Sequence, residues 1–351
     1  MLTKLNQCIV MLTKNCNLRC KFCFEQEAGY CSNDNIDYLK LTKLIDFCNE
    51  SKVKYLLLSG GEPTLYPNLI EILNYIKYKN YGIQPALVTN GIRLSDKAFC
   101  RKLIDNGITY IDISLKGNSS VDCINNTGVD CIESQLKAIK NLATLNAEFT
   151  CSMVITHDNV DSFCDTVELA YNSGGKQFSF TLVIDNVKSE CSENQYLREN
   201  DPVLLVEKFI AQIDKLDNIT RGEWWLEYTF PLCVFSDNQL SMLEGKLASY
   251  CHVFEKNCIV LDTKMNLLPC DMYMDDKMGV FYDDFRTYTD FLIYSQRDIY
   301  KNVTDLLQKP PSEECMSCVQ YEKCRGGCPV FWKNFSFDSF MNFINDKKKC
   351  V

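Results

Sequence analysis

The sequence predicts an α/β fold built around parallel β-strands. Short apolar segments typical of buried strands alternate with longer segments whose apolar residues recur at helical spacing. This alternation repeats regularly through residues 1–184, which favours βα units over an antiparallel meander. A chain of 351 residues, 46% of them apolar, is long enough for one large domain and a smaller one.

Six strands are expected in this first part, each followed by a turn or a helix. We expect strands at 6–13, 55–58, 83–89, 109–115, 147–155 and 176–184, and helices at 34–51, 67–79, 95–106, 134–145 and 159–173. Further on, residues 201–215 have helical spacing, and residues 223–230 suit a strand or an aromatic-rich connector. Sites in parallel α/β folds lie beyond the C-terminal strand ends, so the turns there are candidate site positions.

The pattern divides the chain into three parts. Residues 1–184 carry the βα units, residues 185–250 form a looser connecting segment, and residues 251–351 are dominated by the spacing of cysteines. We see no internal repeat beyond the βα period and no low-complexity linker.

Composition narrows the possible functions. A net charge of −9 argues against a nucleic-acid partner or an anionic membrane surface. With only two histidines, His157 and His252, a His-based triad or a His-rich zinc site is nearly ruled out. The apolar run 8–12 is too short for an export signal or a membrane span, so we expect a reducing cytoplasm, where the 21 cysteines indicate metal binding.

The first cysteine run, Cys16-x3-Cys20-x2-Cys23, offers three thiolates from one loop. Three such ligands can bind three irons of one cubane cluster and leave the fourth iron open to substrate. A zinc knuckle or a pair of disulfides are the alternatives, and an odd number of cysteines suits neither. The run, with Phe22 before its last cysteine, resembles the signature of the radical SAM superfamily. In that family the open iron chelates the amine and carboxylate of S-adenosylmethionine (SAM).

Three turns after later strands resemble the SAM contacts of the same family. The glycine-rich turn after the second strand could by itself be only a tight turn. Its position one βα unit after the cysteine run matches the family motif that contacts the methionyl amine. Lys116 departs from many relatives, which carry an acid there, so its role stays open. The cofactor-binding residues that the resemblance implies are Phe22, Gly60, Gly61, Glu62, Pro63, Thr89, Asn90, Ser114 and Lys116.

Eight cysteines follow in the C-terminal hundred residues, enough for two sets of four. Two zinc sites would use the same residues, because four-thiolate zinc is common. Number, order and spacing resemble the SPASM extension of radical SAM enzymes, although Met265 stands where relatives often have Gly. The resemblance implies one auxiliary 4Fe–4S cluster on Cys251, Cys258, Cys270 and Cys328, and a second on Cys315, Cys318, Cys324 and Cys350. With the SAM cluster this makes three 4Fe–4S clusters on a partial (β/α)6 TIM-type barrel with a cysteine-rich C-terminal domain.

The resemblance implies an enzyme that cleaves SAM to a 5′-deoxyadenosyl radical. SPASM relatives mostly modify peptides or proteins by thioether or carbon–carbon crosslinks, oxidation or epimerisation. We therefore favour a peptide maturase, with a sulfatase-maturing, formylglycine-forming enzyme as the alternative. The segment around Cys270-Asp271 resembles the sulfatase-maturing group, whose acid at this place acts as a base, whereas Phe24 and Val88 stand where that group usually has Tyr and Gln.

Other expectations concern partners and the remaining cysteines. An iron–sulfur electron carrier or a zinc scaffold without catalysis is the hypothesis from another class. The glycine-rich turn speaks against it, because a carrier needs no SAM site. Expected partners are a peptide or protein substrate, a leader-binding protein if the barrel does not hold the leader, and a flavodoxin- or ferredoxin-type electron donor. We expect most of the ten unassigned cysteines to fill the core: Cys8, Cys31, Cys48, Cys100, Cys123, Cys131, Cys151, Cys164, Cys191 and Cys233.

Overall fold

The computed structural model describes residues 4–23, 33–183, 192–227, 230–248, 251–274, 276–333 and 336–349. Cys350, Cys31, Cys191 and Phe24 lie outside this described part. The chain divides into two compact units. The first comprises residues 1–151, 173–175 and 251–308, and the second comprises residues 152–172, 176–250 and 309–351. The sequence predicts domain boundaries after residues 184 and 250, where the pattern of residue types changes. These boundaries stay a prediction.

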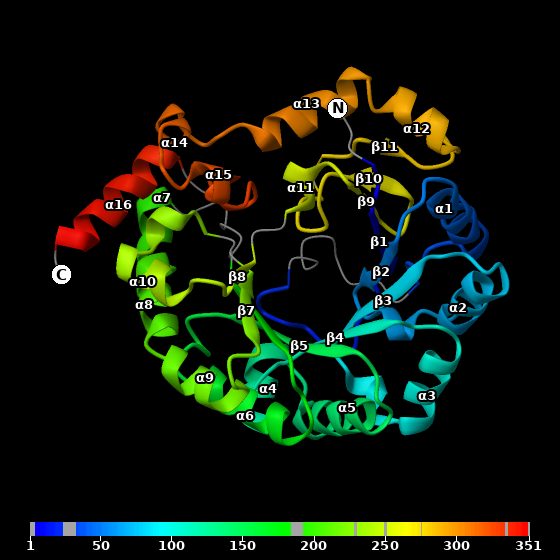
Figure 1. Ribbon diagram of the computed structural model, residues 1–351, viewed down its shortest axis with the longest axis horizontal. Helices are drawn as coiled ribbons and strands as arrows, with labels where there is room; N and C mark the ends of the chain where they lie inside the picture. Colours follow the sequence, from blue (N-terminus) through cyan, green and yellow to red (C-terminus); the bar gives the residue numbers. More distant parts are fainter. Residues whose placement is uncertain are drawn as a thin grey trace. The chain divides into compact units, whose positions relative to one another are not determined.

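The first unit is built on parallel strands joined by helices. The strands are β1 (Gln7–Thr13), β2 (Tyr55–Gly60), β3 (Gln84–Thr89) and β4 (Tyr110–Ser114), each hydrogen-bonded in parallel to the next. The helices between and after them are α1 (Tyr38–Glu50), α2 (Leu69–Tyr78), α3 (Lys97–Asp105), α4 (Ser120–Thr127) and α5 (Ile132–Thr144). Figure 1 shows α1, α2 and α3 side by side along one face of these strands. The strands and helices expected here are confirmed, whereas α4 was not expected.

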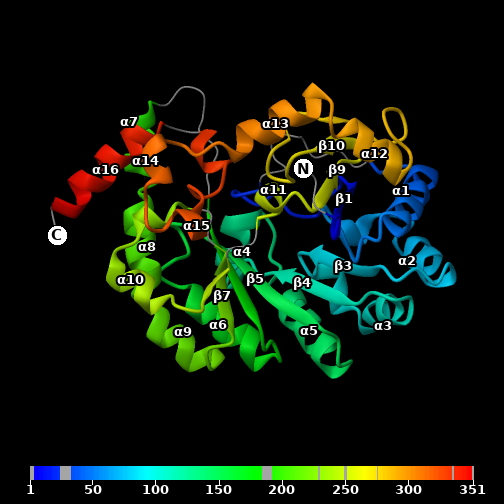
Figure 2. The same ribbon diagram turned by 45° about the horizontal axis from the view of Figure 1, so that its top comes forward.

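Strands from the cysteine-rich part extend the same unit. Strand β9 (Cys258–Leu261) pairs in parallel with β1, and β10 (Asn266–Leu268) and β11 (Gly279–Val280) follow in antiparallel order. Helices α11 (His252–Glu255), α12 (Tyr288–Tyr294) and α13 (Asp298–Gln308) complete this part. In Figure 2, α12 lies beside α1, and the rings of Phe47 and Phe291 meet edge to face, 6.0 Å apart. This packing joins residues that are far apart in the sequence in one core.

The second unit contains β6 (Phe178–Leu182), β7 (Trp224–Glu227) and β8 (Leu247–Ala248), paired in parallel in that order. Strand β5 (Phe149–Ile155) is divided between the two units. The helices here are α6 (Phe163–Asn172), α7 (Glu193–Glu199), α8 (Pro202–Ile210), α9 (Ile213–Thr220), α10 (Asp237–Met242), α14 (Glu313–Met316), α15 (Tyr321–Cys324) and α16 (Phe337–Lys349). Residues 223–230 therefore include a strand, and the helix expected at 201–215 is split into α8 and α9.

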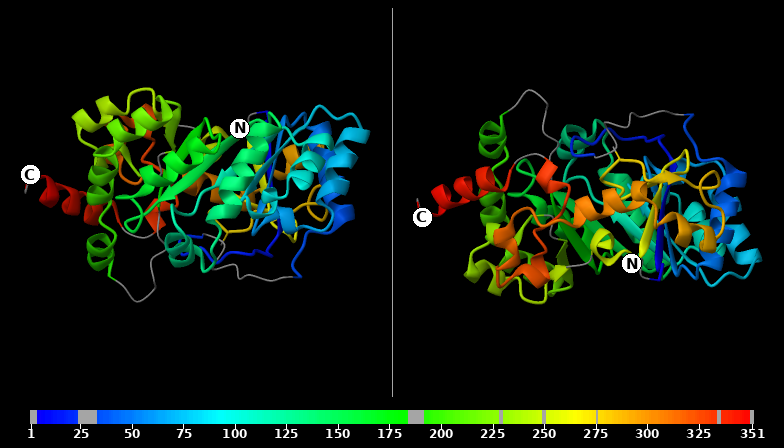
Figure 3. Two further views of the ribbon diagram at one scale, coloured as in Figure 1. Left: turned by 90° about the horizontal axis from the view of Figure 1, so that it is seen from below. Right: turned by 90° about the horizontal axis from the view of Figure 1, so that it is seen from above.

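The parallel arrangement decides where a site can form. Strands β1, β2, β3 and β4 run in one direction, so their C-terminal ends reach the same edge of the sheet. The cysteine loop follows β1 at this edge, and Figure 3 shows it with α4 at one end of the first unit, away from the described N-terminus. No described helix is both long and apolar enough to cross a membrane.

Candidate active site

The glycine-rich turn after β2 packs directly against the end of β1. Gly61 N–H donates to Thr13 O at 2.7 Å, and Glu62 N–H donates to Asn15 O at 2.8 Å. A Cβ on Gly61 would lie 2.6 Å from Asn15 O, and one on Gly60, whose φ is +116°, would lie 2.5 Å from Thr13 O. These two glycines are needed because the backbone that leads into the cysteine loop passes so closely.

The cysteine loop itself is held by the end of α4. Arg19 N–H donates to Thr127 O at 2.8 Å, and Lys21 N–H donates to Asn126 O at 3.0 Å. Ser119 caps the first turn of α4, and Gly128 ends it in the left-handed conformation. A short helix that was not predicted from the sequence therefore fixes the middle of the loop. A serine three residues before Asp122 and a glycine after Thr127 were the signals that could have found it.

The three thiols of the loop fit a metal cluster as a donor set. Burial raises the pKa of the Cys16 thiol to about 11, and the charges of Glu62, Cys20 and Cys23 add to this rise, while a hydrogen bond from Leu18 N–H opposes it. Cys20 is buried and Cys23 is partly buried. Thiols that influence one another in this way favour the thiolate form only when a cation compensates their charge, as iron does.

Glu62 joins the ends of β2 and β3. Its side chain is 1% exposed, and Oε1 accepts hydrogen bonds from Thr89 Oγ1 at 2.6 Å, Thr64 Oγ1 at 2.6 Å and Thr64 N at 3.1 Å. Oε2 accepts one from Asn90 N at 2.8 Å. Pro63 opens the short 3₁₀ helix that Glu62 caps. The carboxylate is therefore engaged by the protein itself, and it holds the predicted SAM residues of two strands in one arrangement.

Asn90 and Gln135 extend this network to the cysteine loop and to β4. Asn90 Nδ2 donates to Asn17 Oδ1 at 2.7 Å. Gln135 of α5 donates from Nε2 to Asn90 O at 2.7 Å and to Ser114 O at 2.8 Å, and its Oε1 accepts from Lys116 N at 3.2 Å. Gln135 was not among the residues predicted from the sequence. The sequence could have pointed to Gln135, because it is a polar residue at helical spacing from the buried apolar residues Ala138, Ile139 and Leu142.

Lys116 is a buried cation next to the cysteine loop. The residue is 6% exposed, and Nζ donates to Ser114 Oγ at 2.6 Å. Nζ also stands 5.2 Å from the centre of the Phe22 ring, within range of a cation–π interaction. The positive charge thus faces the aromatic residue between Cys20 and Cys23. A buried ammonium stabilised in this way suits an anionic neighbour.

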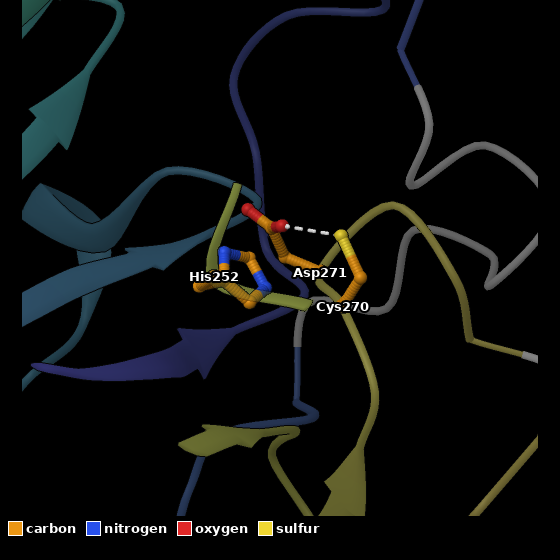
Figure 4. Close-up of side chains that lie close together, drawn as sticks. All are labelled: His252, Cys270 and Asp271. Carbon is orange, nitrogen blue, oxygen red and sulfur yellow. Dashed lines mark hydrogen bonds between the residues drawn. The ribbon is translucent and has the colours of Figure 1, made fainter. Parts of the chain in front are cut away.

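Three of the C-terminal cysteines belong to the first unit and lie near β9 and β10. Cys251 precedes α11, Cys258 begins β9, and Cys270 forms a β-bridge with Tyr273 after β10. Cys270 Sγ donates to Asp271 Oδ1 at 3.3 Å, as Figure 4 shows. Burial raises the pKa of Cys258, and the charge of Asp271 adds to the rise.

His252 lies beside Cys270 and Asp271, and the sequence pattern gave it no role. Burial lowers the pKa of the imidazole, while the charge of Asp271 and a hydrogen bond to the Pro269 carbonyl oppose this shift. Its position next to Cys251 was the available signal, because a histidine adjacent to a presumed ligand is a second potential donor.

The remaining predicted metal ligands belong to the second unit. Burial raises the pKa of Cys315, a backbone hydrogen bond at Ser312 opposes this rise, and the charges of Cys324 and Cys318 add to it. Cys324 Sγ accepts a hydrogen bond from Leu232 N at 3.2 Å. Cys328 follows the turn at Gly327, whose φ is +81° and where a Cβ would lie 2.7 Å from Pro231 N. These thiols suit a metal centre, and Cys350, predicted to join them, lies outside the described residues.

Most unassigned cysteines fill the core, as expected. Those buried among the described residues are Cys8, Cys48, Cys100, Cys123, Cys131, Cys151 and Cys164, while Cys233 is partly exposed. A hydrogen bond between the two thiols lowers the pKa of Cys123 and raises the pKa of Cys131, and the charge of Lys116 opposes the rise at Cys131. This pair therefore lies near the buried lysine.

Residues 10–170 match the family model of the radical SAM superfamily. The GTP 3′,8-cyclase of Clostridium perfringens is 26% identical over 228 residues, which span 58% of this chain and 70% of that protein. The mycofactocin maturase MftC of Mycobacterium tuberculosis is 24% identical over 325 residues, which span 90% of this chain and 76% of that protein.

Solved structures share the fold over nearly the whole chain. Native anSMEcpe with bound AdoMet and the Cp18Cys peptide has a TM-score of 0.68 at 19% identity, covering 99% of this chain and 100% of that one. Streptococcus suis SuiB bound to the precursor peptide SuiA has a TM-score of 0.65 at 16% identity, covering 94% of this chain and 73% of that one. The expected partial barrel of parallel strands is thus confirmed. The chain therefore carries a radical SAM domain.

Proposed function

We propose that this enzyme cleaves SAM at a 4Fe–4S cluster held by Cys16, Cys20 and Cys23 and modifies a peptide or protein substrate. The observation that carries the proposal is the hydrogen-bonded network from Asn17 through Asn90 and Glu62, which ties the cysteine loop to the ends of β2 and β3. A bound cluster would supply the electron that splits the sulfonium of SAM and so generates the 5′-deoxyadenosyl radical.

The residues of the network would bind and orient SAM. Thr89, Asn90 and Ser114 stand at the ends of β3 and β4, where the resemblance places SAM contacts. Lys116 supplies the positive charge that suits the methionyl carboxylate, because it is buried at Ser114 and faces Phe22. The carboxylate of Glu62 acts indirectly in this proposal, since four hydrogen bonds from the protein already occupy it.

A peptide substrate is the class that the comparisons favour. MftC is named a maturase, and the solved structures of anSMEcpe and SuiB contain the peptides Cp18Cys and SuiA. We propose auxiliary 4Fe–4S clusters on the C-terminal cysteines and Asp271 as a base near the first of them. A flavodoxin- or ferredoxin-type donor would supply electrons, and a separate protein would bind a peptide leader that the barrel does not hold. The contact between Cys270 and Asp271 keeps sulfatase maturation as the second candidate.

Iron content tests the cluster assignment. Anaerobically reconstituted protein should hold about twelve irons, four for each of three cubanes. The Cys16/Cys20/Cys23→Ala variant should lose about four irons and all release of 5′-deoxyadenosine. Cys100→Ala, which removes a buried thiol outside the site, is the matched control and should keep both. Wild-type protein with about four irons or fewer would contradict the auxiliary clusters.

Lys116 tests the SAM site separately from the iron. Lys116→Met should weaken SAM binding about tenfold while the iron content stays unchanged, because the change removes a charge but no metal ligand. Lys137→Met, on the exposed face of α5, is the control. Unchanged SAM affinity in Lys116→Met, measured by equilibrium dialysis with the oxidised holoenzyme, which does not cleave SAM, would remove Lys116 from the SAM site.

A further inference from the structure

A pocket opens at the N-terminal ends of β1, β2 and β3, at the edge of the sheet opposite to the cysteine loop. Its volume is about 570 Å³, which is within the range of pockets that hold small ligands. Lys4, Lys52 and Lys54 line it, and no acidic residue is among the described residues around it. We call it the basic pocket. It concentrates positive charge in a chain whose net charge is −9.

Backbone hydrogen bonds fix the segments that form the basic pocket. Lys54 N–H donates to Asn6 O at 2.9 Å, which ties the segment before β1 to the loop before β2. Gln84 N–H donates to Lys54 O at 2.8 Å and adds the start of β3. Val53 N–H donates to Cys48 O at 2.9 Å and adds the end of α1. The walls are therefore formed in advance, and binding has to order only the lysine side chains.

The charges of the three lysines are not balanced by the protein. None of them forms an ion pair with a described carboxylate. The acidic residues of α1 nearest to the pocket in sequence have other partners. Asp46 Oδ1 accepts hydrogen bonds from Tyr75 Oη at 2.7 Å and Tyr81 Oη at 2.9 Å. Glu50 Oε1 accepts one from Tyr288 N at 3.3 Å. Like charges around one hollow repel one another, and a bound anion would remove this repulsion.

The polar groups of the basic pocket suit a phosphate group. Lysine ammonium groups bind phosphate as point charges, and three of them can neutralise a dianion. Lys54 Nζ lies 4.8 Å from the centre of the Tyr55 ring, a cation–π contact that keeps this charge near the strand ends. The side-chain amides of Asn6 and Asn49 belong to the same lining and can donate hydrogen bonds to phosphate oxygens.

The basic pocket also has room for an organic group. Val53 and Ile83, both buried, contribute apolar lining. A Cβ on Gly82 would meet nothing within 4 Å, so the open space extends to the backbone there. Pockets for small organic ligands combine such apolar lining with a few polar groups that fix the orientation.

We propose that the basic pocket binds one small organic phosphate, with the phosphate group at the lysines and an apolar part against Val53 and Ile83. The seven residues of β1, at about 3.3 Å each, put roughly 20 Å between this pocket and the cysteine loop. The ligand therefore binds in addition to SAM and does not compete with it. The site goes beyond the proposed function, which uses none of these lysines.

Equilibrium dialysis of the oxidised holoenzyme with ³²P-labelled inorganic phosphate at low ionic strength tests the charge of the site. About one equivalent should bind at saturation, because one cluster of lysines holds one dianion. Lys4/Lys52/Lys54→Met should lose this equivalent and keep its iron. Each single change to Met should weaken binding about fivefold, the scale of one exposed charge pair.

The matched control removes three positive charges elsewhere in the first unit. Its three lysines lie on exposed faces of α3 and α5: Lys97/Lys137/Lys140→Met. This variant should bind phosphate as the wild type does. Equal phosphate binding by the two triple variants would overturn the site, because net charge alone would then account for the binding.

Displacement of the label tests the organic part of the ligand. Phenyl phosphate should displace labelled phosphate at about a tenfold lower concentration than unlabelled phosphate does, because its ring is partly buried against apolar lining. Phenol should not displace the label. Equal potency of phenyl phosphate and inorganic phosphate would overturn an organic ligand.

SAM binding separates this site from the proposed function. The SAM affinity of the oxidised holoenzyme should be the same in Lys4/Lys52/Lys54→Met and in the wild type. Weaker SAM binding in this variant would overturn the independence of the two sites. A wild-type protein that binds phosphate but no SAM would contradict the proposed function and leave the basic pocket standing.

Discussion

At the scale of single residues, buried polar side chains hold the candidate site together. Glu62 accepts four hydrogen bonds from residues of two strand ends, and Gln135 connects Asn90 to Ser114. Lys116 places a positive charge against the cysteine loop. Such groups are expensive to bury unless they are fully bonded, so each fixes a local arrangement more strictly than an apolar residue would.

Glu62→Ala should destabilise the chain strongly. The substitution leaves the donors of Thr64, Thr89 and Asn90 buried without their acceptor, at a cost of about 3 kcal/mol or more. The midpoint of urea unfolding of the metal-free protein measures this loss. Glu71→Ala, on the exposed side of α2, should change the stability by less than about 0.5 kcal/mol. Equal midpoints for the two variants would show that the network contributes nothing.

Asp271→Asn separates a base from a structural residue. The two side chains are nearly isosteric, so iron content and 5′-deoxyadenosine release should persist. Product formation should fall by roughly a hundredfold or more, the usual scale for a general base. The assay needs the peptide substrate. Product at the wild-type rate would place the base elsewhere, and loss of about four irons would make Asp271 structural.

At the scale of elements, the end of β1 is enclosed by its neighbours. The backbone at the end of β1 passes close to Gly60 and Gly61 in the turn after β2. The end of α4 forms hydrogen bonds with the cysteine loop that follows β1. The proposed iron site on the first cysteine loop would therefore depend on elements whose sequences contain none of its three cysteines.

Gly61→Ala should displace the cysteine loop. The added Cβ would lie 2.6 Å from Asn15 O and 2.9 Å from Lys14 C. Both are backbone atoms, so the main chain of the loop would have to move to relieve the clash. We expect a loss of about four irons and of SAM cleavage, while the C-terminal iron stays. Gly82→Ala is the control, because nothing lies within 4 Å of its added methyl group. Full iron in Gly61→Ala, measured after reconstitution, would show that the loop adapts.

At the scale of the whole molecule, many thiols are part of the core. Cys100 is fully buried and donates from Sγ to Leu94 O at 3.0 Å. Burial raises its pKa to about 11, the charge of Asp96 adds to the rise, and a backbone hydrogen bond opposes it. The native state therefore holds this proton more tightly than the unfolded chain does.

This shift makes stability fall at alkaline pH. A raised native pKa stabilises the fold fully below the unfolded value of 9.0, and this contribution is lost as pH rises to about 11. Between pH 9 and pH 11, the unfolding free energy of the metal-free wild type should fall by roughly 2–3 kcal/mol more than that of Cys100→Ala. This estimate takes about 1.36 kcal/mol for each unit of pKa shift. Urea unfolding under reducing conditions at pH 8, 9, 10 and 11 measures the difference. Parallel pH profiles for the two proteins would contradict it.

The sequence by itself determined those features that depend on residues close together in the chain, namely the strands, the helices and the first cysteine run. Apolar segments and helical spacing predicted the strands β1 to β6 and most helices between them. The spacing of Cys16, Cys20 and Cys23 alone indicated iron, because ligands on one short loop need no distant partner. Parallel strands bring the turns at Glu62, Thr89 and Ser114 to one edge of the sheet, and the resemblance to the radical SAM family marked them as SAM contacts.

Only the tertiary structure decided which distant residues meet. Gln135 contacts Asn90 across 45 positions, and Asn90 contacts Asn17 across 73, so no local pattern connects them. Strand β9 joins β1, which places residues 251–308 in the same unit as the first cysteine loop. His252 lies beside Cys270 and Asp271 only because the turn after β10 brings them to it. Long-range packing sets these contacts, because the free energy that forms them comes from burying whole elements rather than from the residues that meet.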